Sequence, residues 1–101
     1  MAKVVRLTSS HVLAGVWAAT DSSVRYSITP RGTGFEVSAV DSEDGEEIQI
    51  SGVNWDGRVL RFTSVCPSTE WRLDHILEVT NMGTVTHRYT RYDDWRRVED
   101  L

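Results

Sequence analysis

The stretch from Trp71 to Tyr89, WRLDHILEVTNMGTVTHRY, decides the fold class. Apolar side chains alternate with charged ones along residues 71–79, and a second alternating run occupies residues 85–89. Successive side chains of a β-strand point to opposite faces, so a period of two is typical of a strand with one buried face. Because the turn residues Asn81-Met82-Gly83 separate the two runs, the stretch predicts a β-hairpin.

A loop of three residues would set the register of this hairpin, with His75 opposite Tyr89 and Leu77 opposite His87. These side chains would share the inner face of the sheet, where imidazole and phenol groups need hydrogen-bond partners if they are buried. Two interpretations stay open. The polar rings bond to one another, to backbone or to water within a packed core, or they orient a bound ligand.

Alternation of the same kind runs through the preceding part of the chain. Residues 24–29 and 35–40 form two such runs, and Arg31-Gly32-Thr33-Gly34 supplies the turn between them. The acidic segment Asp41–Glu47 follows. It lacks the twelve-residue spacing of carboxylates in calcium-binding loops, and we therefore expect a solvated hairpin tip.

The run from Ile48 to Trp55 changes parity at its middle. An uninterrupted strand would point Ile48 and Ile50 to one face, and Val53 and Trp55 to the other. Gly52 lies between the two pairs, and a glycine inside a strand pattern indicates a β-bulge. We expect a bulge at Gly52 that returns all four apolar side chains to the core.

Asp56-Gly57 is the strongest turn signal in the chain. It predicts a two-residue hairpin loop in which the glycine accepts a positive φ angle. Such a loop would place Val53 opposite Leu60 and Ser51 opposite Phe62.

The two ends of the chain are ambiguous. Around His11 to Ala14 the sequence could form a helical turn before a strand begins at Val16 and Trp17, and residues 92–98 could be a closing strand or a short terminal helix. Short strands joined by tight turns, without helical crossovers, predict an all-β fold. We expect a single domain over residues 1–101, a small antiparallel up-and-down barrel of about seven or eight strands, closed or nearly closed so that few strand edges are exposed.

The overall charge argues against a polyanionic partner. The chain carries 11 Lys and Arg against 15 Asp and Glu, a formal net charge of -4, so nucleic acid has no general attraction to it. One cysteine, Cys66, leaves no internal disulfide and suits a reducing compartment. No run is typical of a signal peptide or of a membrane span. We expect a cytoplasmic protein that binds neither nucleic acid nor membrane.

The run Leu13-Ala14-Gly15-Val16-Trp17 resembles the Gly-x-Trp signature of the lipocalins and the wider calycin superfamily. In those barrels the tryptophan closes one end, and an arginine near the carboxyl terminus packs across its ring. The resemblance implies a lipocalin-like barrel with a small-molecule-binding lumen, and a cation–π contact of Trp17 with Arg96 or Arg97. The chain departs from lipocalins in being shorter, in having one cysteine and in showing no run typical of a signal peptide.

Metal binding and catalysis lack their usual sequence patterns. A metal site at His75 and His87 would need His11 or Cys66 as further ligands, and their spacing is not that of a zinc or iron site. A nucleophile beside His75 would come from the turn Cys66-Pro67-Ser68-Thr69, which no nucleophile motif surrounds. We therefore expect no metal and no cofactor, and a small barrel enzyme ranks third among the functional hypotheses.

The first hypothesis is a non-catalytic barrel that binds a small apolar or aromatic ligand in its lumen. The second is an interaction module with a solid core, which could act as a homodimer. The residues expected at the ligand site are rings on the predicted inner face: Tyr26, Phe62, Trp71, His75, His87 and Tyr89.

Overall fold

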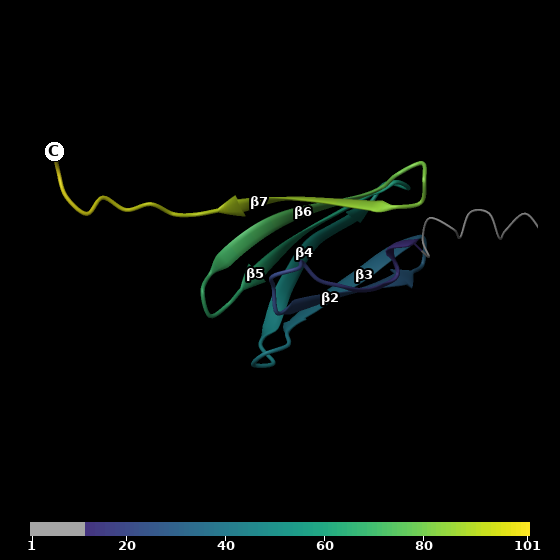
Figure 1. Ribbon diagram of the computed structural model, residues 1–101, viewed down its shortest axis with the longest axis horizontal. Coiled ribbons are helices and arrows are strands. Elements are labelled where there is room, and N and C mark those ends of the chain that lie inside the picture. The colour runs from purple at the N-terminus through teal and green to yellow at the C-terminus, as the bar shows by residue number, and fades with distance from the viewer. Residues whose placement is uncertain (1–11) are drawn as a thin grey trace, which may run out of the picture.

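The computed structural model describes residues 12–101, and its seven strands form one antiparallel sheet (Figure 1). The strands are β1 (Gly15–Trp17), β2 (Val24–Arg31), β3 (Gly34–Asp41), β4 (Glu47–Trp55), β5 (Val59–Cys66), β6 (Trp71–Val79) and β7 (Val85–Tyr92). Their order in the sheet is their order in the sequence, so each strand pairs with the next one along the chain. This arrangement confirms the predicted all-β, up-and-down architecture.

The sheet curls into a half-barrel, and β1 and β7 form its two edges (Figure 1). The regular pairing of β3 with β4 is limited to Ala39 with Ile48 and Val40 with Glu47, near their turn, and the two strands then diverge (Figure 1). Side chains of β2 and β3 therefore meet those of β5 and β6 across the concave side. Within the described residues β1 and β7 do not pair, so the closed form of the predicted barrel is not reached.

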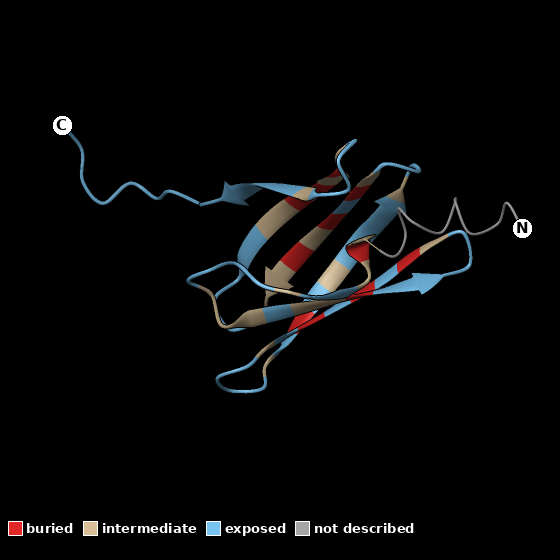
Figure 2. Cartoon of the chain, turned by 45° about the vertical axis from the view of Figure 1, so that its right-hand side comes forward, coloured by how far each residue is buried: buried red, intermediate tan, exposed pale blue. Residues whose placement is uncertain are grey.

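Buried side chains alternate with exposed ones along the strands, as the red bands in Figure 2 show. One cluster collects the buried apolar residues of the concave face: Leu13, Ile28, Phe35, Val37, Leu60, Phe62, Leu77 and Val79. Each buried side chain of this size contributes roughly 1.5 to 3 kcal/mol relative to an exposed one. The concave face is therefore the hydrophobic core that holds the two halves of the sheet together.

The register of the hairpin β6–β7 is the one that a three-residue loop predicts. His75 lies opposite Tyr89, and Leu77 lies opposite His87. The pairing continues to the turn, where the Thr80 amide donates to the Thr84 carbonyl at 2.8 Å.

The predicted bulge at Gly52 is confirmed. The register between β4 and β5 shifts between Ser51 and Asn54, and Gly52 has a φ of 64°. The expectation for its effect on Val53 is wrong, because that side chain is 39% exposed. The bulge keeps Trp55 packed against the core but leaves Val53 on the outside.

The loop between β4 and β5 is displaced from its predicted position. Trp55 pairs with Leu60, and Ser51 pairs with Thr63, so both predicted pairs, Val53 with Leu60 and Ser51 with Phe62, are wrong. The Asp56 carboxylate accepts hydrogen bonds from the amides of Arg58, at 2.9 Å, and Val59, at 2.8 Å.

These two bonds explain the displacement of the loop. They hold Asp56 at the end of its strand, where its own amide donates to the Val59 carbonyl at 3.2 Å. The residues at the tip are therefore Gly57, with a φ of 100°, and Arg58.

The carboxyl-terminal end of the chain differs from both alternatives considered for it. After Tyr92, residues 93–101 form neither strand nor helix and extend away from the sheet (Figure 1). The predicted contact of Arg96 or Arg97 with Trp17 is wrong, because the cation–π pairs of the described chain are Arg72 with Tyr92 and Arg91 with Trp71.

At the other end, His11 lies outside the described residues. Val12 and Leu13 have helical backbone, and the Trp17 indole donates to the Leu13 carbonyl at 2.8 Å. This bond fixes the entry into β1. Within residues 12–101 no helix has the length and apolar character needed to cross a membrane.

We expect Gly52→Ala to lower the free energy of unfolding by about 1 to 2 kcal/mol, because L side chains disfavour a positive φ. Nothing lies within 4 Å of the position that a Cβ would take there, so the cost is conformational. Urea denaturation measures it.

Gly34→Ala is the matched control. Its φ is not in the left-handed region, and its Cβ would meet the Trp55 Cβ at an ordinary 3.9 Å. We expect a change within about 0.5 kcal/mol. Equal losses in the two variants would contradict the assignment of a strained bulge.

Candidate functional site

His75 lies at the middle of β6 on the concave face, and its side chain is 4% exposed. The strand pairing brings Phe62 of β5 opposite it on one side and Tyr89 of β7 opposite it on the other. A buried imidazole is therefore flanked by aromatic rings from both neighbouring strands.

Four rings form a nearly parallel series across β5, β6 and β7. Phe62 stacks on His75 with centroids 4.5 Å apart and planes 17° apart, and His75 stacks on His87 at 5.2 Å and 20°. His87 continues to Tyr89 at 5.5 Å and 20°. From β2, Tyr26 meets His75 edge-on at 5.1 Å. We call Phe62, His75, His87 and Tyr89 the ring series.

Hydrogen bonds connect the same residues in a chain. Ser64 Oγ lies 2.8 Å from His75 Nε2, and His75 Nδ1 lies 3.0 Å from His87 Nε2. The Tyr26 hydroxyl extends the chain, 3.5 Å from Ser64 Oγ. Both nitrogens of the buried imidazole are thereby satisfied, and among the described residues no buried side-chain polar atom is left without a partner.

The hydrogen-bond chain can run in either of two senses. If Ser64 donates to Nε2 of His75, then Nδ1 of His75 carries the proton and donates to His87. If His87 donates to His75, then His75 donates to Ser64, and Ser64 donates to Tyr26. In both senses His75 is neutral: its proton is on Nδ1 in the first and on Nε2 in the second.

The environment keeps this cluster uncharged at neutral pH. Burial lowers the pKa of His75 from its ordinary value of 6.5 to about 4, and the neighbouring His87 adds to the shift, while Asp74 opposes it. Burial also lowers the pKa of His87 and raises that of Tyr26. The charged form of each group is disfavoured because it would lose hydration without gaining a counter-ion.

The ring series ends at the edge of the sheet, where Tyr89 is 61% exposed and His87 is also exposed. With Tyr26, the ring series brings together five of the six predicted site residues. Trp71 does not join them: it is 53% exposed near the start of β6, and the Arg91 guanidinium lies over its ring at 4.2 Å.

Ser64 and Arg91 lie on the concave face, but they are not among the residues that the sequence predicts for the ligand site. Ser64 follows Leu60 and Phe62 on the inner parity of β5, so a hydroxyl at an expected core position was the available signal. Arg91 shares the parity of His87 and Tyr89 on β7.

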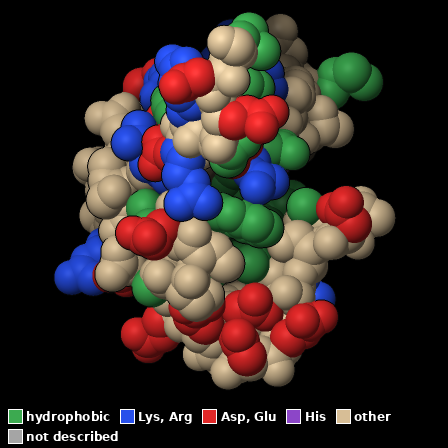
Figure 3. Space-filling view, turned by 90° about the vertical axis from the view of Figure 1, so that its left-hand side faces the viewer, with side chains coloured by type: hydrophobic (Ala, Val, Ile, Leu, Met, Phe, Trp, Pro, Cys, Tyr) green, Lys and Arg blue, Asp and Glu red, His purple; other side chains and the backbone are tan. Residues whose placement is uncertain are grey.

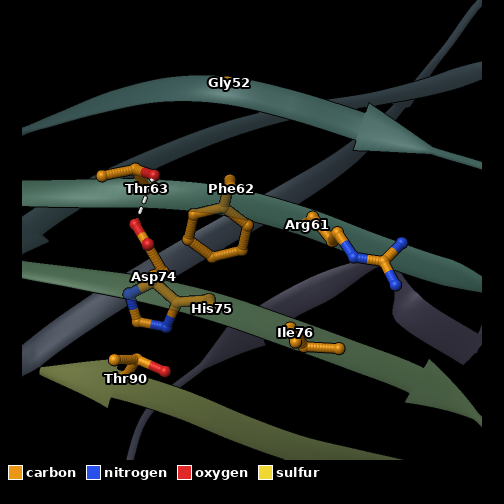
Figure 4. Close-up of a pocket in the computed structure, with 8 residues that line it drawn as sticks. All are labelled: Gly52, Arg61, Phe62, Thr63, Asp74, His75, Ile76 and Thr90. Atoms are coloured by element: carbon orange, nitrogen blue, oxygen red, sulfur yellow. Dashed lines mark hydrogen bonds between the residues drawn. The ribbon is translucent and has the colours of Figure 1, made fainter.

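The opposite face of the same strands carries a second polar network. Asp74 accepts hydrogen bonds from the Thr63 hydroxyl at 2.7 Å and from the Tyr92 hydroxyl at 2.8 Å, and the bond from Thr63 is the main reason that its pKa is lowered. A depression of about 350 Å³ lies beside it (Figure 4). Its lining consists of Gly52, Arg61, Phe62, Thr63, Asp74, His75, Ile76 and Thr90.

The turn Cys66–Thr69 has a structural role. The Cys66 thiol donates to Glu46 Oε1 at 3.3 Å, and the Ser68 hydroxyl donates to the same oxygen at 2.8 Å. The Ser68 amide binds Glu46 Oε2 at 2.9 Å. These bonds tie the turn to the tip of the β3–β4 hairpin and lower the pKa of Glu46.

The hydroxyl that does meet His75 is that of Ser64, which is 3% exposed and shielded from solvent. A nucleophile needs room for the substrate, which this buried position does not provide. Among residues 12–101, no three His, Cys, Asp or Glu side chains gather into a group that could hold a metal ion.

Replacing His75 should remove a pH dependence of stability. In the unfolded chain the imidazole has its ordinary pKa of 6.5, whereas in the folded chain its pKa is about 4. As pH falls from 6.5 towards 4, the unfolded chain takes up a proton that the folded chain does not, so the free energy of unfolding decreases by about 1.4 kcal/mol per pH unit. Above pH 6.5 this contribution is constant.

The measurement compares wild type with His75→Phe by urea denaturation at several pH values. The variant keeps a ring in the series but cannot titrate, and subtraction removes the contribution of the carboxylates that both proteins share. We expect the stability advantage of the wild type to shrink between pH 6.5 and pH 4. A difference that stays constant over this range would show that His75 titrates alike in both states.

Comparison of the chain with protein-family models, with curated proteins and with solved structures gives no match. The resemblance to lipocalins is therefore supported only at the level of a curled antiparallel sheet compatible with a small β-barrel.

Proposed function

We propose that the concave face binds a small, uncharged, planar aromatic or apolar molecule, which stacks on the exposed end of the ring series. The observation that carries this proposal is the continuation of a stack from the core outward to Tyr89, which is 61% exposed. A planar ligand would cover an apolar ring that now faces solvent, and aromatic pairs add about 0.5 to 1.5 kcal/mol beyond the area buried.

The hydrogen-bond chain supports the same proposal. It holds His75 in one orientation through Ser64 and His87, so the rings at the site are ordered before a ligand arrives. Preorganisation of this kind reduces the entropy lost on binding. The lowered pKa values of both histidines favour an uncharged ligand, because no imidazolium is present at neutral pH to pair with an anion.

A ligand of this kind would enter from the concave side of the half-barrel. Seen from the end where the C-terminal tail leaves, apolar side chains lie in a hollow between basic side chains, and acidic side chains gather along one border (Figure 3). A concave, mostly apolar surface with a few polar groups is the usual composition of a small-molecule site.

The second hypothesis, an interaction module, also has an observation in its favour. β7 is an eight-residue strand at the edge of the sheet. An unpaired edge offers hydrogen-bonding groups to another strand. The two hypotheses share Tyr89, which lies on this edge strand and also ends the ring series on the concave face.

Tyr89→Ala should weaken the binding of an uncharged aromatic probe such as N-phenyl-1-naphthylamine by about five- to tenfold, which corresponds to about 1 kcal/mol of lost stacking. The measurement is a fluorescence titration at pH 7, with the tryptophans as donors. Tyr92→Ala is the control, because Tyr92 lies on the same strand and points to the other face, where it binds Asp74. Its affinity for the probe should equal that of the wild type.

Two results would overturn the proposal. One is the absence of saturable binding by the wild type, both for this probe and for a panel of uncharged aromatic compounds. The other is an equal loss of affinity in both tyrosine variants, which would place the probe away from the ring series.

A further inference from the structure

The two edges of the sheet are unequal. β1 has three residues, whereas β7 has eight and keeps an unbroken register with β6 from Val85 to Tyr92. Within the described residues no strand lies on the other side of β7. A long regular edge is a template for one more strand.

The backbone groups that face outward on β7 follow from the hydrogen bonds on both sides of β6. The Thr80 amide binds the Thr84 carbonyl, and the Val79 amide binds the Arg58 carbonyl. Even-numbered residues of β6 therefore bond towards β7, and odd-numbered ones towards β5. In an antiparallel ladder the bonded pairs alternate, so the amides and carbonyls that point away from the sheet are those of Val85, His87, Tyr89 and Arg91.

A second copy of β7 can satisfy these groups only in certain registers. Residues with outward-facing amides and carbonyls must lie opposite residues of the same kind. In an antiparallel β7–β7 pair about a two-fold axis, one residue therefore lies opposite its own copy, and the axis is named by that residue. An axis at Arg88 pairs residues 85–91, and an axis at Tyr89 pairs residues 86–92, each covering seven of the eight residues of the strand.

Charge distinguishes these two registers. An axis at Arg88 places that guanidinium directly opposite its own copy, and like charges in this position are destabilising. An axis at Tyr89 places Arg88 opposite Thr90 and Arg91 opposite His87, whose pKa is lowered by burial so that it is uncharged at neutral pH. No two like charges then face each other across the pair.

The aromatic side chains favour the same register. An axis at Tyr89 sets this ring next to its copy, so the ring series of one chain would continue into that of the other. Two exposed tyrosines, Tyr89 at 61% and Tyr92 at 45% exposure, lie on β7 itself.

We propose that β7 pairs antiparallel with β7 of a second copy of this chain, about a two-fold axis at Tyr89. The pairing joins two half-barrels into one continuous sheet, with the concave faces on the same side. In this dimer the partner's Tyr89 would lie at the exposed end of the ring series, so a second copy and a ligand compete for that end, and each is tested by its own measurement.

Disulfide cross-linking tests both the partner and the register. In a Cys66→Ser background, Arg88→Cys and Thr90→Cys proteins are mixed and mildly oxidised. With the axis at Tyr89 the two cysteines form a non-hydrogen-bonded pair with Cα atoms about 4.5 Å apart, within reach of a disulfide. Cysteines at position 88 of both copies would be diagonal neighbours roughly 7 to 8 Å apart, which a disulfide does not span without backbone movement.

We expect efficient formation of the mixed 88–90 dimer, identified by its mass, and little cross-linking of Arg88→Cys with itself. Val16→Cys, on the exposed edge strand β1, reports random collisions and should cross-link poorly. Sedimentation equilibrium of the unmodified protein should give twice the chain mass of 11.4 kDa.

Each contrary result has a definite meaning. A monomer at all concentrations, with mixed cross-linking no greater than that of Val16→Cys, would overturn the dimer. Preferential self-linking of Arg88→Cys would retain a β7–β7 dimer but overturn the axis at Tyr89. Binding of the aromatic probe at Tyr89 is measured separately, by the fluorescence titration of the wild type and the two tyrosine variants.

Discussion

The buried imidazole of His75 constrains the rest of the concave face. Both of its nitrogens must be hydrogen-bonded, and Ser64 and His87 are the groups that bond them. An unsatisfied polar group at this depth would cost about 1 to 3 kcal/mol. The bonds therefore hold the His75 ring in place. On one side this ring stacks on Phe62 of the apolar core, and on the other it lies opposite Tyr89 at the exposed edge of the sheet.

The alternation of the strands separates two kinds of polar network. Asp74 lies on the other face of β6 and is bonded by Thr63 and Tyr92, so its charge is held outside the core. His75 faces inward and stays neutral. This separation lets the concave face combine stacking surface with hydrogen-bonding groups, which is the basis of both the ligand proposal and the extension of the ring series across a dimer.

Local patterns in the sequence predict the strands, the β6–β7 register and the Gly52 bulge, because each depends on residues close together in the chain. The predicted β4–β5 register is wrong because the Asp56 carboxylate accepts hydrogen bonds from the amides of Arg58 and Val59. The tendency of Asp-Gly to form turns does not reveal these two bonds. The grouping of five predicted site residues follows from strand parity. Trp71 has the same parity, but it begins β6, beyond the ring series, and is 53% exposed. Barrel closure was also beyond local patterns, since it depends on how the two edges lie in space.

The most direct test of this account is the protonation state of His75 itself, observed through the ¹⁵N chemical shifts of its ring nitrogens by NMR over a range of pH. We expect a neutral ring at pH 5.5, with one protonated and one unprotonated nitrogen, and titration only near pH 4. Titration near the ordinary pKa of 6.5 would contradict it, because a ring that accepts a proton so readily is neither buried nor bonded to Ser64 and His87 as described.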